Sequence, residues 1–406
     1  MQKCRACDSS INPFMTFGKM PIANGFLSKD QFAKEYFFEM QVASCAKCGL
    51  FQLIDQPDKE MMFHGNYAFF SGTSSAMQKH FAGYADMVKT EYLRDKDPFV
   101  VEIGSNDGIL MINFAQSGIR HLGVEPSANV AEVARKRGVQ TLNKFFNRET
   151  AEEIVAGQGK ADAFMAANVM CHIPFFHSVI EGIDTLLKEK GVVVFEEPYL
   201  GDVLAKTSYD QIYDEHVFLF SLTSITYVFG VHGFELIDVQ PQETHGGSMR
   251  YILARKGMRP VSAKVGQFLK AEKEAGLDKP ETYLKFKAAC EKSKRDLTGL
   301  LSDLKSKGKR VVGYAATSKS TTVLNYCGIG PDLLEFISDT TPIKQGKFSP
   351  GMHIPVLSRE VFASKYPDYA LLLGWNHAKE IMANEQAFKQ GGGKWVSFVP
   401  TVGIQE

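Results

Sequence analysis

The chain has 406 residues, of which 44% are apolar and 23% charged, and its 46 Lys and Arg balance its 46 Asp and Glu. This length exceeds one small core, so we expect two or three globular domains, and the zero net charge argues against a general nucleic-acid binder. The N-terminus lacks the apolar segment of a signal peptide, and no apolar run approaches ~18 residues, so we expect a cytoplasmic protein without a transmembrane helix.

Two Cys-x-x-Cys pairs stand in the N-terminal segment. Cys4 and Cys7 belong to CRAC, and Cys45 and Cys48 belong to CAKC. Two such turns can present four thiolates to one tetrahedral Zn²⁺. We therefore predict a structural zinc site in a zinc-binding domain over residues 1–70, with surface thiols or a redox pair as the alternative. Four thiolates leave no open coordination position, so this metal would hold the fold and would not activate water.

Residues 71–258 alternate apolar strands with amphipathic helices. Strands are predicted in DPFVVEIGSNDG, HLGVEPS, ADAFMAANVM, GVVVFEEP, GFELIDVQPQ and GGSMRYILARKG, and helices in SANVAEVARKRG and FFHSVIEGIDTLLKEKG. The last of these helices is expected to end at its Lys residues and Gly191. The buried, continuous strands are typical of a parallel sheet, so the series predicts a doubly wound α/β domain.

The turn after the first of these strands carries a ligand-binding pattern. In VVEIGSNDG, Gly104 allows the backbone to approach a ligand closely, and we expect the next helix to direct its N–H groups into the same space. Asn106 stands where a dinucleotide fingerprint has its second glycine, which weakens a pyrophosphate cradle. Glu125 ends the second strand, where an acid accepts ribose hydroxyls. The structural alternative is a plain tight turn with Glu125 as a helix N-terminal acid.

This combination resembles the class I methyltransferases that use S-adenosylmethionine (SAM). Their first motif is an acidic residue followed by a Gly-rich turn, and an acid ends their second strand. The resemblance implies that Gly104, Asn106 and Glu125 contact SAM. By analogy, Asn168 would line the methionine end of the cofactor.

The stretch YDQIYDEH, residues 209–216, follows the predicted strand that ends in FEEP. Ligands of a doubly wound sheet sit beyond the carboxyl ends of its strands, so this stretch and His172 are expected at the same edge. Methylation at carbon requires a base near neutral pKa and a donor to the developing enolate oxygen. His216 would supply the base, with Tyr213 as donor and Glu215 as a carboxylate that orients the imidazole. The alternative is a histidine and a tyrosine packed only for structure.

Residues 259–406 begin with a Lys- and Glu-rich helical connector over 262–308. The following KRVVGYAATSKSTTVLNY predicts strand, turn and helix, and LLEFISD, DYALLLGW and KWVSFVP predict further strands of a smaller Rossmann-like domain. Its turn lacks the glycines of a dinucleotide site, which argues against NAD. Lys319 would face a phosphate or lie solvated at a helix start, and we favour the solvated position.

The order and spacing of these motifs resemble the sugar C-methyltransferases of deoxysugar biosynthesis, of the tetronitrose C-3′ type, over essentially the whole chain. The resemblance rests on CRAC…CAKC, GNYAFFSGTSSAMQKHF, VVEIGSNDG, NVMCHI, YDQIYDEHVFLFS, THGGSMRYI, GYAATSKSTTVLNYCGI, FSPGMHIPV and GWNHAKEI. It implies SAM and zinc as cofactors and a nucleotide-linked keto-deoxysugar as substrate. His216 would then be the base and Tyr213 and Glu215 its helpers, while His172 and Tyr67 would be further pocket residues. The C-terminal domain would help to hold the nucleotide, and THGGS would shape the sugar side.

Two other functions stay open: a small-molecule O- or N-methyltransferase, in which a base matters less, and a non-catalytic zinc-ribbon adaptor. We expect neither a nucleic-acid nor a membrane partner, with a monomer as the working expectation. The sugar, the carbon and the nucleotide are left open. No role is assigned to the histidines without clustered partners or to the thiols expected to be buried: His64, His80, His121, His177, His377, Cys171, Cys290 and Cys327.

Overall fold

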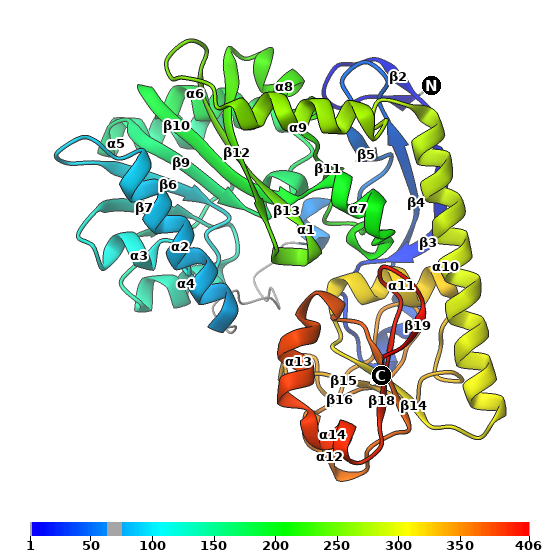
Figure 1. Ribbon diagram of the computed structural model, residues 1–406. Helices are drawn as coiled ribbons and strands as arrows, with labels where there is room; N and C mark the ends of the chain where they lie inside the picture. Colours follow the sequence, from blue (N-terminus) through cyan, green and yellow to red (C-terminus); the bar gives the residue numbers. More distant parts are fainter. Residues whose placement is uncertain (1, 63–74, 406) are drawn as a thin grey trace.

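The computed structural model describes residues 2–62 and 75–405, and Figure 1 shows three regions strung along the chain. The N-terminal region (blue) contains β1 (Gln2–Lys3), β2 (Ser10–Ile11), β3 (Met15–Pro21), η1 (Lys29–Lys34), β4 (Phe37–Ser44), β5 (Phe51–Leu53) and α1 (Lys59–Met62). β1 pairs with β2, and an antiparallel sheet has the order β11-β5-β4-β3. Its edge strand β11 (Phe218–Leu219) comes from the middle of the chain, so this sheet joins two distant segments.

The middle region is built on a seven-stranded sheet of order β12-β13-β10-β9-β6-β7-β8. Its strands are β6 (Phe99–Ile103), β7 (Arg120–Val124), β8 (Thr141–Leu142), β9 (Ala161–Ala167), β10 (Leu187–Pro198), β12 (Phe234–Gln242) and β13 (Ser248–Arg255). All neighbours pair in parallel except β13, which runs antiparallel between β10 and β12. The doubly wound prediction is confirmed, and this strand order is that of the class I methyltransferase fold.

Helices connect these strands: α2 (Ser75–Glu91), α3 (Ile112–Ala115), α4 (Ala128–Lys136), α5 (Arg148–Gln158), η3 (Met170–His172), α6 (Phe176–Leu186), α7 (Leu200–Lys206), η4 (Tyr209–Gln211), α8 (Leu222–Gly230) and η5 (Thr244–Gly246). Alternate residues of the strands enter two separate cores, because successive side chains of a strand point to opposite faces. Val100, Ala163 and Val194 belong to one core, and Val101, Phe164 and Phe195 to the other. Both faces are therefore buried, as the continuous apolar strands predicted.

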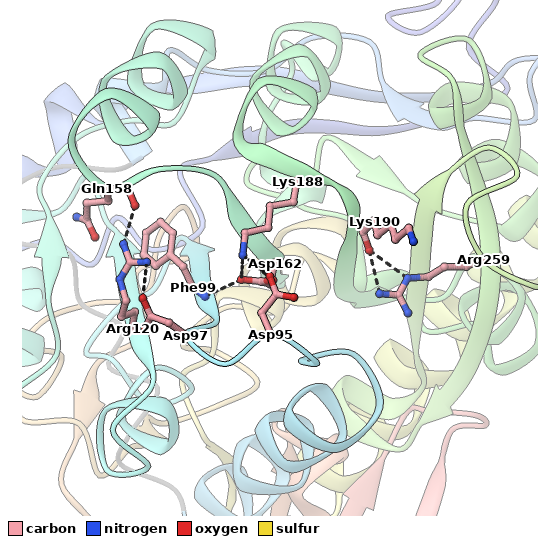
Figure 2. Close-up of polar contacts among 9 residues, drawn as sticks. All are labelled: Asp95, Asp97, Phe99, Arg120, Gln158, Asp162, Lys188, Lys190 and Arg259. Carbon is pink, nitrogen blue, oxygen red and sulfur yellow. Dashed lines mark hydrogen bonds and ion pairs between the residues drawn. The ribbon is translucent and has the colours of Figure 1, made fainter.

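One predicted boundary is wrong. The helix expected to reach Gly191 ends at Leu186, and β10 begins at Leu187. Leu187 pairs with Ala161 and Val192 with Ala163, so the residues between them bulge out of the ladder. The ammonium of Lys188 does not cap a helix, because it lies 2.8 Å from a carboxylate oxygen of Asp162 and 2.7 Å from one of Asp95 (Figure 2).

The same edge of the sheet holds further structural polar contacts, all visible in Figure 2. Asp162 also accepts a 2.8 Å hydrogen bond from the backbone N–H of Phe99. Arg259 donates to the carbonyl of Lys190 at 2.9 Å, and Arg120 donates to that of Gln158 at 2.6 Å. These contacts tie the amino ends of the strands together, opposite to the edge where the predicted site lies.

The last region follows two helices, α9 (Ala263–Glu274) and the long α10 (Pro280–Ser306), which runs from the N-terminal region to the C-terminal one in Figure 1. The six-stranded sheet has the order β16-β15-β14-β17-β18-β19, parallel except for the last pair. The strands of this sheet are β14 (Val311–Tyr314), β15 (Ile337–Ser338), β16 (Val356–Leu357), β17 (Tyr369–Leu372), β18 (Lys394–Ser397) and β19 (Gly403–Gln405). The helices of the region are α11 (Ser318–Cys327), α12 (Arg359–Ser364), η6 (Trp375–His377), α13 (Ala378–Asn384) and α14 (Gln386–Gln390). The smaller Rossmann-like domain is thus confirmed. Within the described ranges, every helix is too short or too polar to cross a bilayer.

Candidate active site and zinc centre

The four predicted zinc ligands come together. The sulfur of Cys4 lies 3.6 Å from that of Cys48, and the sulfur of Cys7 lies 3.5 Å from that of Cys45. Zn–S bonds of ~2.3 Å in a tetrahedron place sulfurs about 3.8 Å apart, so this cluster fits Zn²⁺. Gln52 on β5 donates to the Cys4 sulfur at 3.2 Å and so supports the centre from the sheet.

The turn after β6 is held by internal contacts. Gly104 has φ +58°, and a Cβ there would lie 2.3 Å from a methyl of Val169, so glycine is required by backbone conformation and by packing. Asn106 is also left-handed, with φ 49°, a conformation that asparagine tolerates. Glu125 accepts hydrogen bonds from the backbone N–H groups of Asn106 (2.9 Å) and Ser127 (2.8 Å). Burial raises the pKa of this carboxyl.

The helix expected directly after this turn begins late and is short. Turns extend through residues 105–111, and α3 contains only Ile112–Ala115. Its N-terminus therefore supplies little of the anion binding that a long helix would give.

Two buried acceptors at the carboxyl ends of β6 and β9 fit a cofactor with donor groups. Oε2 of Glu102 and Oδ1 of Asn168 have no hydrogen-bond partner in the described part of the chain. Burial, followed by repulsion from Glu125, raises the pKa of Glu102 well above its usual value. Asn168 has φ 56° and donates its N–H to the carbonyl of Glu196 at 2.8 Å. Buried polar groups are rarely left unpaired, so both oxygens suit hydrogen bonds from the ammonium or the ribose hydroxyls of bound SAM.

The stretch 209–216 is buried throughout. His216 is 4% exposed, and its Nδ1 lies 2.7 Å from the carbonyl oxygen of Gln211. Because a carbonyl only accepts, Nδ1 carries the hydrogen, and Nε2 has the lone pair. That nitrogen accepts from the Tyr213 hydroxyl at 2.8 Å. Burial, followed by the neighbouring His172, lowers the pKa of His216 well below 6.5, so the imidazole is neutral at pH 7.

All three regions hold this stretch. From the N-terminal region, the N–H of Ala23 donates to the Asp214 carboxylate at 3.2 Å, and Gln56 donates to the Asp214 carbonyl, also at 3.2 Å. From the C-terminal region, the Thr322 hydroxyl donates to the carbonyl of Ile212 at 2.7 Å. β11 then follows at once and pairs with β5. The position of His216 therefore depends on residues about 200 positions before it and 100 after it.

Glu215 does not occupy the place expected for it. Its Oε1 accepts a 2.6 Å hydrogen bond from Asn24, whose own side-chain oxygen accepts from the Ser318 hydroxyl at 2.9 Å. The contact that orients the His216 imidazole is made by the backbone of Gln211 instead. Glu215 thus joins the N-terminal and C-terminal regions beside the predicted base.

His172 lies at the same edge of the sheet, as predicted. Its ring stacks on that of His216 with centroids 5.2 Å apart and planes 25° apart. Burial lowers the pKa of His172 to about 4, so this ring is also neutral. Tyr67, the other predicted pocket residue, lies outside the described residues.

The C-terminal region contributes residues that the sequence did not single out. The indole N–H of Trp375 donates to Asp210 at 2.7 Å, and a Cβ on Gly246 would lie 2.0 Å from the Trp375 ring. Gln211 donates to the carbonyl of His245 in the same loop. Trp375 therefore clamps η4 against η5, and with them the carbonyl that orients His216.

The favoured prediction for Lys319 is wrong. Its side chain is not solvated but 8% exposed, and its Nζ has no hydrogen-bond partner among the described residues. Burial lowers its pKa to about 8, although Asp210 partly offsets this. The cause is the docking of α11 against η4, which encloses the first turn of the helix.

His80, to which no role was assigned, also has a specific partner. Its Nε2 lies 2.6 Å from Oε2 of Glu196 at the end of β10, and Arg250 on β13 donates to the other oxygen of the same carboxylate at 2.5 Å. The Arg250 guanidinium lies 4.2 Å from the Tyr84 ring centroid. This network fixes α2 to the edge of the sheet that carries the site.

Each of the three regions matches a known protein family. Residues 4–63 match a family model described as "putative zinc binding domain", residues 77–239 a "methyltransferase domain", and residues 243–400 a "C-methyltransferase C-terminal domain". The chain is 35% identical to the C-methyltransferase NovU of Streptomyces niveus over 405 residues, which cover 98% of this chain and 96% of NovU. The chain belongs to this C-methyltransferase family.

Solved structures resemble part of the chain. A SAM-dependent methyltransferase from Anabaena variabilis is 16% identical, with a TM-score of 0.36 over 44% of this chain and 86% of that chain. The magnesium protoporphyrin IX methyltransferase of Synechocystis, solved with S-adenosylhomocysteine (SAH), is also 16% identical, with a TM-score of 0.34 over 44% and 83% of the two chains.

The predicted family, fold class and cofactors are confirmed. The protein is a C-methyltransferase with a class I SAM-dependent domain, and its N-terminal zinc-binding domain gathers Cys4, Cys7, Cys45 and Cys48 in a cluster that fits Zn²⁺. A small molecule is its substrate class.

Proposed function

We propose that this C-methyltransferase acts on a nucleotide-linked keto-deoxysugar and methylates a carbon next to the ketone. The domains are proposed as residues 1–70, 71–258 and 259–406. Gly104, Asn106, Glu125 and Asn168 would line the SAM site, where bound SAM offers its methyl group on a sulfonium. The resemblance of the motifs to sugar C-methyltransferases supports this substrate class.

One observation carries the proposal: the Nδ1–H of His216 is committed to the Gln211 carbonyl, which leaves the Nε2 lone pair as a base. The C–H bond beside the ketone breaks, its proton passes to Nε2, and its electron pair forms the enolate. Because burial disfavours the imidazolium, this cation forms together with the enolate anion beside it. The enolate carbon would then take the methyl group from the sulfonium, whose S–CH₃ bond would break and return its electron pair to sulfur to give SAH.

Tyr213 is proposed as the donor to the enolate oxygen. Its hydroxyl already lies 2.8 Å from Nε2 of His216, so the base and the donor sit at one point. A preorganised donor to a developing oxyanion stabilises it most in a site from which water is excluded. His172, Glu215 and Tyr67 would shape the same pocket.

Lys319 is proposed to face the diphosphate of the substrate. A buried ammonium without a hydrogen-bond partner in the described structure is costly, and a phosphate anion would supply the missing partner. Lys319 lies in the first turn of α11, whose N–H groups also favour an anion. Replacement by Met should weaken binding of a nucleoside diphosphate by about tenfold to a hundredfold.

The test follows proton exchange and methyl transfer separately. With SAH in place of SAM, the wild-type protein in D₂O should exchange the proton beside the ketone of a TDP-, GDP- or CDP-linked keto-deoxysugar, as seen by NMR. His216→Asn should lose both exchange and methyl transfer by about 10²–10⁴-fold, yet retain SAH binding in calorimetry. His121→Asn, a buried histidine at the opposite edge of the sheet, serves as the control. Normal exchange in His216→Asn would remove the proposed base, and an appreciable rate without exchange would favour O- or N-methylation.

A further inference from the structure

A second cluster of metal-ligating side chains lies beside the proposed base. In residues 2–62 and 75–405, two groups bring three or more such side chains together: the four zinc-binding cysteines, and Cys171 with His172 and His216. The sulfur and one nitrogen of each ring in the second group lie within 4.8 Å of one another. An ordinary buried thiol was expected at Cys171, and the clustering of the three ligands arises only in the fold.

Both imidazoles are already in the form that binds metals. Nε2 of His216 carries a lone pair because Nδ1–H donates to Gln211, and a backbone carbonyl is a usual partner for the second nitrogen of a metal-bound histidine. The two rings stack 25° apart and are neutral. Neither ring must lose a proton before it binds a cation.

A carboxylate stands behind the thiol. Oε1 of Glu197 accepts hydrogen bonds from the backbone N–H groups of Met170 (2.7 Å) and Cys171 (3.3 Å). Its Oε2 is buried and has no hydrogen-bond partner in the described structure. Glu197 thus fixes the backbone that carries the thiol.

The ligand set selects the class of cation. One thiolate and two imidazoles suit borderline and soft ions such as Zn²⁺, Co²⁺ and Cd²⁺, whereas Mg²⁺ and Ca²⁺ prefer oxygen. Zn–N bonds of ~2.0 Å and Zn–S bonds of ~2.3 Å need ligand atoms about 3.3–3.5 Å apart, so a group within 4.8 Å closes by at most about 1.5 Å. Three protein ligands leave a fourth position open, unlike the closed four-cysteine centre.

We propose that Cys171, His172 and His216 form a second, exchangeable site for a thiophilic divalent cation, and that a cation bound there blocks methyl transfer. The inhibition rests on the proposed function, because the cation takes the Nε2 lone pair of His216 that would receive the proton. It also displaces the Tyr213 hydroxyl from that nitrogen. Binding of the cation itself does not depend on the proposed role of His216.

The experiment uses protein whose four-cysteine centre is already loaded with zinc. Co²⁺ is added, and absorption bands of thiolate-bound cobalt are followed with one expected equivalent per chain. In parallel, Zn²⁺ is titrated into the methyl-transfer assay, and a chelator should reverse the inhibition. Cys171→Ala should keep the basal rate, lose the cobalt bands and raise the inhibitory Zn²⁺ concentration by at least about tenfold.

Cys327→Ala is the matched control, because it removes another buried thiol that lies outside the cluster, and it should bind and respond like the wild type. Absence of the thiolate–cobalt bands in the wild type, or equal zinc inhibition in Cys171→Ala and wild type, would overturn the proposal. If His216→Asn is inactive but zinc does not inhibit the wild type, the metal site is refuted and the proposed base is not. Cobalt binding at the cluster with an active His216→Asn would instead sink the proposed base and leave the site standing.

Discussion

The indole Nε1–H of Trp375 donates a 2.7 Å hydrogen bond to the carboxylate of Asp210, across 165 residues of sequence. Asp210 is fully buried, and its neighbour Gln211 supplies the carbonyl that orients His216. Trp375 of the C-terminal domain thus contacts the residue next to the one that orients the proposed base.

Trp375→Phe should lower kcat more than it raises KM. Phenylalanine keeps a ring against Gly246 but removes the charge-assisted hydrogen bond to Asp210, which is worth about 1.5–3 kcal/mol. We expect a loss of roughly tenfold to a hundredfold in kcat with unchanged SAH affinity. Steady-state kinetics check this, with Trp395→Phe in the core of the C-terminal domain as control. An equal loss in both variants would mean that only the domain's stability matters.

Removal of zinc should abolish turnover while the middle domain still binds SAH. Gln52 contacts the Cys4 sulfur and pairs with Phe218, two residues after His216, so loss of the metal loosens the strand that anchors the proposed base. Cys45→Ser is the variant, and Cys290→Ser, a buried thiol of α10, is its control. Metal content, calorimetry with SAH and the methyl-transfer rate are measured together. Full activity of zinc-free Cys45→Ser would contradict the coupling.

Lys319→Met should stabilise the protein near neutral pH. Burial lowers the pKa of Lys319 from 10.5 to about 8, so the folded protein binds fewer protons than the unfolded chain between these values. Stability therefore rises as the pH increases through that window, and below pH 8 the full penalty of roughly 3 kcal/mol is present.

Urea unfolding of the wild type at pH 7 to 10 should show this rise, and Lys319→Met should lack it and be more stable at pH 7. Lys273→Met, at an exposed position of α9, should follow the wild type. A destabilised Lys319→Met protein would show that the ammonium has a stabilising partner, against its proposed role in substrate binding.

Gly104→Ala should be strongly destabilising, because the new methyl meets Val169 at 2.3 Å and the backbone has φ +58°. The clash and the left-handed conformation together should cost several kcal/mol, about 1–3 for each. Adding Val169→Ala should recover the part due to the clash. Melting temperatures of the two single variants and the double variant form the cycle that separates the two causes. No recovery would assign the whole effect to the backbone.

Local patterns predicted the sheets well and their long-range contacts poorly. The four cysteines and the continuous strands could be predicted because spacing and hydrophobicity act within a few residues. β11 could not, because Phe218 and Leu219 form a strand only by pairing with β5. The helix end near Leu186 was misplaced because Lys188, which resembles part of a C-terminal signal, instead binds Asp162 and Asp95.

The site shows the same division. His172 follows the carboxyl end of β9, and Tyr213 and His216 follow that of β10, so the predicted strands already placed all three at one edge of the sheet. The burial of Lys319 and the partners of His80 and Trp375 depend on domain docking and on residues more than 100 positions away. A run of polar residues in the sequence does not by itself distinguish a solvated lysine from a buried one.

The pairing of β11, which follows His216, with β5 constrains how this chain can evolve and be engineered. Since residues 209–219 are shared by all three regions, no terminal region can be exchanged between relatives as a self-contained cassette. A chimera with the N-terminal or C-terminal region of a relative would also replace the residues that hold the His216 imidazole in place. Changes of substrate preference in this family should therefore arise by coordinated substitutions where the regions contact one another, and recombination breakpoints should avoid these contacts.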